Sequence, residues 1–233
     1  MIWALVENQK IETIPKTMGN CLLCNEQVFS KCGEVNVWHW AHLKTENCDS
    51  WYEPETFWHK HWKLTFGKEN TEIIIKKNAK RHIADVYTNK KIVIELQNSL
   101  ISKSVIRERE AFYGEKMIWL INGEQFEKNL TIKDYWEDKD YHEMKSLPRN
   151  PIRWKRSTPE IKKGINGEFF KWKYSRKSWL NVQRHVFIDF GKDSLFWVKG
   201  GMGTSQIRGE FVLKEKFITK YGGNYNYYCQ HQV

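Results

Sequence analysis

The chain has 233 residues, of which 40% are apolar, and its 12 Trp, 12 Phe and 10 Tyr indicate a folded protein and exclude a disordered tail. Its net charge of +10 favours an acidic partner. No apolar run approaches the roughly 20 residues of a membrane-spanning helix, and Glu7 comes too early for a signal peptide. We therefore expect a cytoplasmic protein of one sizeable domain or two small ones, with no membrane partner and with reduced or metal-bound cysteines.

Residues 1–52 are predicted to form a separate unit around a metal ion. A CxxC motif is followed by HWAH, which gives the spacing C-x2-C-x14-H-x2-H. The four predicted Zn²⁺ ligands are Cys21, Cys24, His39 and His42. A short acidic segment with little core needs such a metal to fold, and four protein ligands make the site structural. Cys32 and Cys48 are replacement candidates, and buried reduced cysteines are the other interpretation.

A helix is predicted from Pro54 to Leu64, with the proline in its first turn. Glu55, His59 and Lys63 recur at helical spacing and share one face. The face expected to pack on the core carries Phe57, His61 and Leu64. The polar stripe is either an ordinary solvated surface or the border of an active site.

Ile83–Tyr87 and Ile92–Gln97 are apolar, β-branched runs joined by a polar segment, a pattern that predicts a hairpin. If the loop is centred on Lys90, Asp85 lies opposite Glu95 and the other face is apolar. A two-residue turn would mix acids with apolar side chains, so the pattern favours the first register. Opposed carboxylates lie roughly 5 Å apart at Cβ, close enough to share Mg²⁺ or Mn²⁺. A solvated polar face is the other interpretation.

The elements around this hairpin complete an order of α, β, β, β, α, β. A strand is predicted at 73–76, a helix at 102–115, and a fully apolar strand, MIWLI, at 117–121. The last strand should be buried, since it is apolar throughout and is reached through a helix.

Residues 124–233 are predicted to form a basic, aromatic, β-rich region, with strands at 185–190, 195–198 and 210–217. Residues 145–192 carry 13 Lys and Arg against 3 Asp and Glu, with aromatic residues interleaved. This composition suits phosphates and base stacking, and it suits a solvated basic face equally well. The candidate nucleic-acid-binding residues here are Lys155, Arg156, Lys171, Lys173, Arg176 and Lys177.

From Cys21 to about Gly123 the chain resembles the competence protein CoiA-like family of the PD-(D/E)XK nuclease superfamily. The resemblance rests on the joint order of CLLC, HWAH, ETFWHKHWK, ADV, IELQNS, Arg107 with Tyr113, and MIWLI. It implies an α+β fold whose αβββαβ, restriction-endonuclease-like core spans residues 53–123. The zinc-ribbon-like unit precedes this core and the β-rich region follows it.

The resemblance also implies a catalytic site on the hairpin. Asp85 and Glu95 match the two metal-binding acids, and the backbone carbonyl of Leu96 joins them in holding Mg²⁺ or Mn²⁺. Gln97 stands where most of the superfamily has Lys, and its role would be to orient the attacking water.

The family's E-x3-H-x3-K pattern matches Glu55, His59 and Lys63. Glu55 would take part in a second metal site or hold the metal through water, and His59 would relay a proton. Lys63, Arg81 and Arg107 are candidates for neutralising the developing phosphoryl charge.

The function implied is a metal-dependent nuclease, acting on DNA more than on RNA, in DNA uptake and recombination or in defence against foreign DNA. A recombination or defence protein is a candidate partner. Two alternatives stay open: a nuclease-like module that binds nucleic acid without cutting it, and a ribonuclease, which the same acids would serve equally well.

Overall fold

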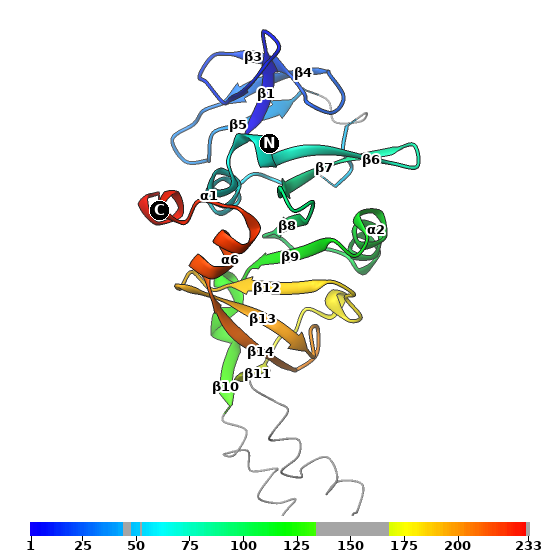
Figure 1. Cartoon of the computed structure of the whole chain (residues 1–233), viewed down its shortest axis with the longest axis vertical. Helices are drawn as coiled ribbons and strands as arrows, with labels where there is room; N and C mark the ends of the chain where they lie inside the picture. The colour runs from blue at the N-terminus through cyan, green and yellow to red at the C-terminus, as the bar shows by residue number, and fades with distance from the viewer. Residues whose placement is uncertain (44–47, 52, 134–167, 232–233) are drawn as a thin grey trace, which may run out of the picture.

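The computed structural model of the chain describes residues 1–43, 48–51, 53–133 and 168–231. It contains two β-sheets, a small one in the N-terminal segment and a large one in the rest of the chain (Figure 1). Two candidate nucleic-acid-binding residues, Lys155 and Arg156, lie outside the described residues. Within the described ranges, no helix is long and apolar enough to cross a membrane.

The small sheet has five antiparallel strands in the order β2-β1-β3-β4-β5. Their bounds are β1 (Trp3–Val6), β2 (Gln9–Glu12), β3 (Met18–Asn20), β4 (Gln27–Lys31) and β5 (His39–His42). Its buried apolar core is small and consists of Ala4, Cys21, Leu23, Val28 and Trp40. A core of this size agrees with the expectation that the unit needs another source of stability.

The large sheet has nine strands in the order β10-β11-β14-β13-β12-β9-β8-β7-β6. Their bounds are β6 (Thr71–Lys77), β7 (Lys80–Tyr87), β8 (Val93–Gln97), β9 (Met117–Asn122), β10 (Leu130–Lys133), β11 (Glu168–Trp172), β12 (His185–Asp189), β13 (Ser194–Gly200) and β14 (Gln206–Leu213). The interior strand β9 pairs in parallel with β8 and β12, and the other pairs are antiparallel. The strands that follow residue 123 therefore continue the same sheet.

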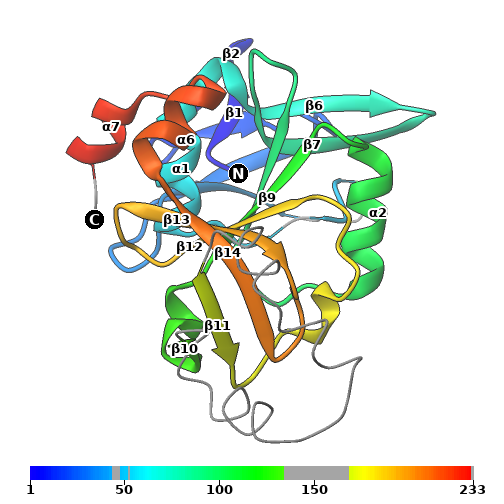
Figure 2. The ribbon, with the colours of Figure 1, turned by 60° about the horizontal axis from the view of Figure 1, so that its bottom comes forward.

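Helices cover both faces of the large sheet (Figure 2). Their bounds are α1 (Phe57–Phe66), α2 (Lys103–Tyr113), α6 (Lys214–Tyr221) and α7 (Tyr225–Gln230), with short 3-10 turns at Lys68–Asn70, Glu124–Asn129 and Lys177–Trp179. Alternate residues of β9 face the two sides. Trp119 packs on the side of α2, whereas Leu120 packs on the side of α1 and α6. Every residue of β9 is buried, as its apolar sequence predicts.

The order α1, β6, β7, β8, α2, β9 appears in the structure as the sequence predicts. The start of α1 differs, because Thr56 caps it and accepts a hydrogen bond from the backbone N–H of His59. Pro54 and Glu55 therefore precede the helix. The prediction of its core face was wrong, since Phe57 is 50% exposed while His59 and the opposite face are buried. Carboxylates inside the protein, described below, compensate for burying this polar face.

The hairpin has the register centred on Lys90, because Val86 pairs with Ile94 and Tyr87 with Val93. Continued one step, this register sets Asp85 opposite Glu95. The strands part there, and the backbone N–H of Leu96 donates to Asp85 Oδ2 over 3.0 Å. The acidic pair therefore stands where β7 and β8 separate.

The segment predicted as a strand at 210–217 changes at Leu213 from strand to helix, which corrects its second half. The change buries Lys214, whose Nζ lies 2.8 Å from Asp189 Oδ1 and 2.7 Å from the hydroxyl of Tyr228. Asp189 Oδ2 also accepts hydrogen bonds from the indole N–H groups of Trp58 and Trp62 on α1. This buried carboxylate thus joins α1 to the C-terminal helices.

Replacing Asp189 with Ala should lower the free energy of unfolding by roughly 3–5 kcal/mol, because it leaves the buried Lys214 charge without its carboxylate partner. Urea unfolding measures this loss. Asp193→Ala removes a neighbouring exposed carboxylate and should change stability by less than about 0.5 kcal/mol. Equal effects of the two substitutions would contradict the role of Asp189.

Candidate active site and metal cluster

A pocket of about 290 Å³ opens between the N-terminal unit, α1 and the hairpin of β7 and β8. Its ionisable lining residues from the large domain and the segment before it are Asp49, Glu53, Glu55, His59, Lys63, Glu72, Asp85, Glu95 and Arg109. The N-terminal unit contributes residues that include Lys31, His39 and His42. The pocket therefore brings together most of the catalytic residues that the sequence predicts, from segments far apart in the chain.

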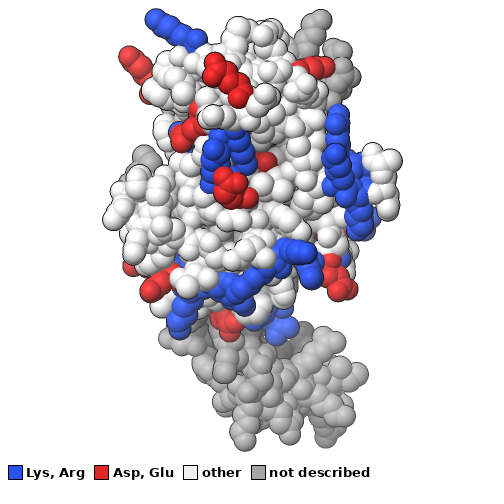
Figure 3. Space-filling model, turned by 45° about the horizontal axis from the view of Figure 1, so that its top comes forward, with Lys and Arg blue, Asp and Glu red and all other residues white. Residues whose placement is uncertain are grey.

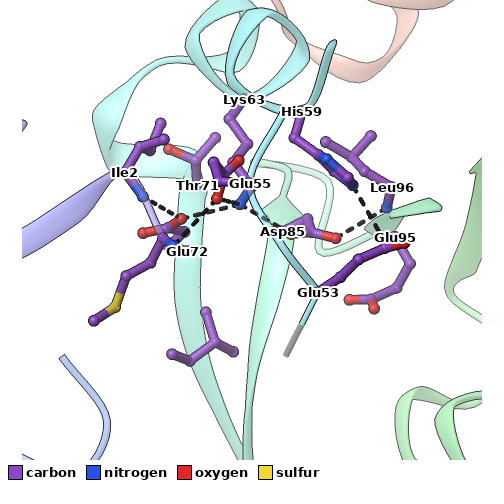
Figure 4. A network of polar contacts seen from close by, with 12 residues as sticks. Ile2, Glu53, Glu55, His59, Lys63, Thr71, Glu72, Asp85, Glu95 and Leu96 are labelled. Atoms are coloured by element: carbon purple, nitrogen blue, oxygen red, sulfur yellow. Dashed lines mark hydrogen bonds and ion pairs between the residues drawn. The ribbon is translucent and has the colours of Figure 1, made fainter. Parts of the chain in front are cut away.

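Lys63 is the centre of a buried charge cluster in this pocket (Figure 4). Its Nζ lies 2.9 Å from Glu55 Oε2, 3.0 Å from Glu72 Oε1 and 3.2 Å from Asp85 Oδ1. Burial disfavours the ammonium, but the attraction of these carboxylates outweighs it and holds the pKa of Lys63 well above its ordinary value. Burial likewise opposes ionisation of Glu55, yet Lys63 holds the pKa of that carboxyl at about 2.

Glu72 is a part of the site that sequence reasoning missed. Besides Lys63, it accepts hydrogen bonds from the backbone N–H groups of Ile2, over 2.7 Å, and Trp3, over 3.0 Å. Its backbone has φ of 48°, a left-handed conformation that costs energy for a residue other than glycine. The only sequence signal was an acid at the start of an apolar strand, and nothing local indicates a partner 70 residues away.

Glu95 is 2% exposed, and its two carboxylate oxygens differ. Oε2 accepts a hydrogen bond of 2.9 Å from Arg109, whereas Oε1 has no hydrogen-bond partner among the described residues. Burial first, and then the negative charge of Asp85, raise the pKa of Glu95 to about 8. The Tyr113 hydroxyl lies close enough to lower this pKa somewhat, without meeting the geometry of a hydrogen bond. A cation beside Oε1 would satisfy a carboxylate that is otherwise costly to ionise.

Arg109 pairs with Glu95, a role that the sequence did not predict for it. It lies on the buried face of α2, and its Nη2 donates to the carbonyl of Trp51 over 2.6 Å. The predicted Arg107 lies on the same helix but is exposed and outside the pocket. Arg81, at the far end of the β6–β7 hairpin, is also exposed and outside the pocket. Helical spacing indicates that Arg109 lies on the core face of α2. A buried arginine needs a carboxylate partner, and the sequence does not show which distant residue supplies it.

Glu53 organises the other side of the pocket. Its carboxylate lies 3.4 Å from His59 Nε2 and accepts a hydrogen bond of 3.1 Å from Gln97 Nε2. Thr56 Oγ1 lies 2.9 Å from the other ring nitrogen of His59, so the imidazole is held from both sides. Gln97 does not line the pocket, and its Oε1 is buried without a hydrogen-bond partner among the described residues.

The candidate nucleic-acid-binding residues between 168 and 231 also lie outside the pocket. Lys171, Lys173 and Lys177 are exposed, and Arg176 is half-buried with its guanidinium 4.4 Å from the centre of the Phe126 ring. Burial lowers the pKa of Arg176, and the charge of Glu53, an acid that lines the pocket, partly opposes this shift.

The predicted zinc site needs one correction. The ligand atoms that gather within 4.8 Å of one another belong to Cys21, Cys24, His42 and Cys48. His39 does not belong to this cluster, and its Nδ1 donates to the carbonyl of Val37 over 2.8 Å. Alternation along β5 explains this result, since residues 39 and 42 are an odd number apart and point to opposite faces.

The geometry of this cluster fits a tetrahedral metal such as zinc. Cys21 Sγ lies 3.6 Å from Cys48 Sγ, and Cys24 Sγ lies 3.2 Å from His42 Nε2. Zn–S bonds of about 2.3 Å at tetrahedral angles would set sulfur atoms about 3.8 Å apart. A hydrogen bond from Cys48 lowers the pKa of Cys21 to about 5, which favours the thiolate that a metal binds.

Replacing Cys48 with Ser should lower the bound zinc per chain and destabilise the N-terminal unit, because three ligands remain and the apolar core is small. Elemental analysis of the purified protein and thermal unfolding measure the two effects. Cys32→Ser is the matched control and should keep the full zinc content. Loss of zinc from the Cys32 variant alone would contradict the ligand set.

Two family models match the chain. Residues 5–50 match the model of the competence protein CoiA N-terminal domain, and residues 58–178 match that of the CoiA nuclease-like domain. The comparison with curated proteins gave no match, and neither did the comparison with solved structures. The nuclease-like match alone covers more than half of the chain. The chain therefore belongs to the competence protein CoiA-like family, with a nuclease-like domain that carries the acid pocket.

Proposed function

We propose that the protein is a metal-dependent nuclease that hydrolyses phosphodiester bonds in DNA. The observation that carries this proposal is the pair Asp85 and Glu95, which stand at the point where two strands part, with one buried oxygen of Glu95 lacking any hydrogen-bond partner in the described residues. Two carboxylates in such a position repel each other, and a divalent cation removes this cost.

Asp85, Glu95 and the backbone carbonyl of Leu96 would hold Mg²⁺ or Mn²⁺. The N–H of Leu96 points to Asp85, and in an extended residue the carbonyl points to the same side as the N–H, which supports its role as the third ligand. When bound, the cation polarises the scissile phosphate and lowers the pKa of a water molecule. The order of elements from α1 to β9 supports a core like that of restriction endonucleases.

The chain's own residues supply the remaining functions. Lys63 is released from Asp85 if a cation binds there, and its ammonium can then neutralise charge that develops on the phosphate. His59, held between Thr56 and Glu53, is placed to accept or return a proton at Nε2. Glu55 forms an ion pair with Lys63, and it supports the lysine or a second cation.

The Cys₃His cluster would hold Zn²⁺ as a structural ion, because all four positions are filled by protein ligands. The exposed lysines at 171, 173 and 177, together with Arg176, Lys155 and Arg156, are proposed to bind nucleic acid. We further propose a cytoplasmic role in DNA uptake and recombination, which family membership supports, or in defence against foreign DNA, with a protein partner from the same process.

One observation favours a second function, a module that binds nucleic acid without cutting it. Gln97, which replaces the usual lysine, is tied to Glu53 and lies outside the pocket, while Lys63 already neutralises Asp85. A ribonuclease would use the same acids. The three functions differ in what the protein does to labelled DNA and RNA when a metal is added.

Incubation of the protein with labelled single- and double-stranded DNA and RNA should give cleavage of DNA with Mg²⁺ or Mn²⁺ and none with chelator. Asp85→Asn and Glu95→Gln should each slow cleavage by about 10²-fold or more, because each removes a negative ligand of the cation. Binding of the same substrates should be retained.

Glu108→Gln, which neutralises an exposed acid on α2, serves as the control and should cut at the parent's rate. Full cleavage by both acid variants would contradict the site. Metal-dependent cleavage of RNA alone would identify a ribonuclease, and tight binding without any cleavage would identify the binding module.

A further inference from the structure

The far end of the β6–β7 hairpin projects beyond the body of the large sheet (Figure 1). Asn78 and Ala79 form its two-residue turn, and both have positive φ, 49° and 62°, as a tight hairpin turn requires. We refer to residues 76–81 as the arm. All six residues of the arm are exposed, although apolar side chains closer to the pocket, Ile74 and Ile83, pack against the N-terminal unit.

The arm sets like charges directly opposite one another. Lys76 pairs with Arg81, and Lys77 pairs with Lys80. Opposed like charges destabilise a hairpin, and stacking two such pairs beside the turn adds to the repulsion. Lys77 is tied to α2, where its Nζ donates to the carbonyl of Phe112 over 3.1 Å. The other three cations form no ion pair within the part of the chain that the structure describes. Figure 3 shows Lys and Arg side chains gathered on the side where the arm projects.

The arm and the acid pocket lie along one hairpin, and the N-terminal unit covers the stretch between them, where Ile74 and Ile83 pack against it. Alternate residues of a strand share a face, so Arg81 and its partner Lys76 lie on the same face of the hairpin as Asp85, whereas Lys80 lies beside the turn on the opposite face. Four residues of strand separate Arg81 from Asp85, a rise of roughly 13 Å.

We propose that the arm is a binding surface for the phosphate backbone of the nucleic acid whose scissile bond enters the pocket, with Lys76, Lys80 and Arg81 as the contacting residues. This inference rests on the proposed nuclease function and specifies which surface holds the substrate. A polyanion removes the repulsion between opposed cations, and counterions released from its phosphates favour binding. Arg81 therefore acts at a distance from the scissile phosphate, and not in the pocket as the sequence suggested.

The test compares three triple variants with the parent in the binding of a fluorescent DNA duplex and its single strand, from 50 to 300 mM salt, without added Mg²⁺ or Mn²⁺. The arm variant is Lys76→Gln, Lys80→Gln and Arg81→Gln. The second variant is Lys171→Gln, Lys173→Gln and Lys177→Gln. The control, remote from the arm, is Lys16→Gln, Lys216→Gln and Lys220→Gln, which removes the same formal charge from exposed positions.

The arm variant should bind the better of the two DNA forms at least about tenfold more weakly than the control. Its slope of log K against log salt concentration should be less negative by about 2–3, the value for the loss of three phosphate contacts. Its thermal unfolding midpoint should equal or exceed that of the parent, because the repulsion is relieved, so weak binding would not reflect misfolding.

Equal affinities and slopes for the arm variant and the control would overturn the inference while leaving the nuclease proposal intact. A fall in the unfolding midpoint of the arm variant would assign the cations a structural role and overturn it too. Binding of polyglutamate to the arm as tightly as DNA would indicate a protein-docking surface instead. A parent that binds neither DNA form would contradict both proposals.

Discussion

The rest of the site depends on the ion pairs that the buried ammonium of Lys63 forms. Its carboxylate partners come from three places: Glu55 before α1, Glu72 at the start of β6 and Asp85 on β7. None of these charges would tolerate burial alone, since an unpaired buried ion costs several kcal/mol. The cluster therefore fixes the helix against two strands, and through the backbone contacts of Glu72 it fixes the N-terminal unit as well.

The cluster leaves negative charge in excess, which is what a cation site requires. Among the described lysine and arginine side chains, Lys63 and Arg109 form ion pairs with the pocket acids, and the N-terminal ammonium of Met1 lies 3.2 Å from Glu55 Oε2. Glu95 keeps one oxygen without a partner in the described residues, and burial together with the negative charge of Asp85 raises the pKa of this carboxyl. A divalent ion beside Asp85 and Glu95 is the simplest group that satisfies both carboxylates.

Sequence patterns within single elements correctly predicted the register of one hairpin and the burial of one strand. The register of the hairpin followed from its apolar face, and the buried strand β9 followed from MIWLI. Long-range partners were beyond such reasoning. Cys48 takes the place of His39 in the metal cluster, because strand alternation, and not spacing alone, decides which side chains meet. The polar face of α1 is its buried face, a reversal that only the acids of β6 and β7 explain.

The most direct test of the account is anomalous diffraction from crystals of the protein soaked in Mn²⁺. The account predicts a manganese peak about 2.1 Å from carboxylate oxygens of both Asp85 and Glu95, with Lys63 Nζ withdrawn from Asp85. It also predicts a separate zinc signal at the Cys₃His cluster. An acid pocket without manganese at saturating concentration, with Lys63 still paired to Asp85, would contradict it.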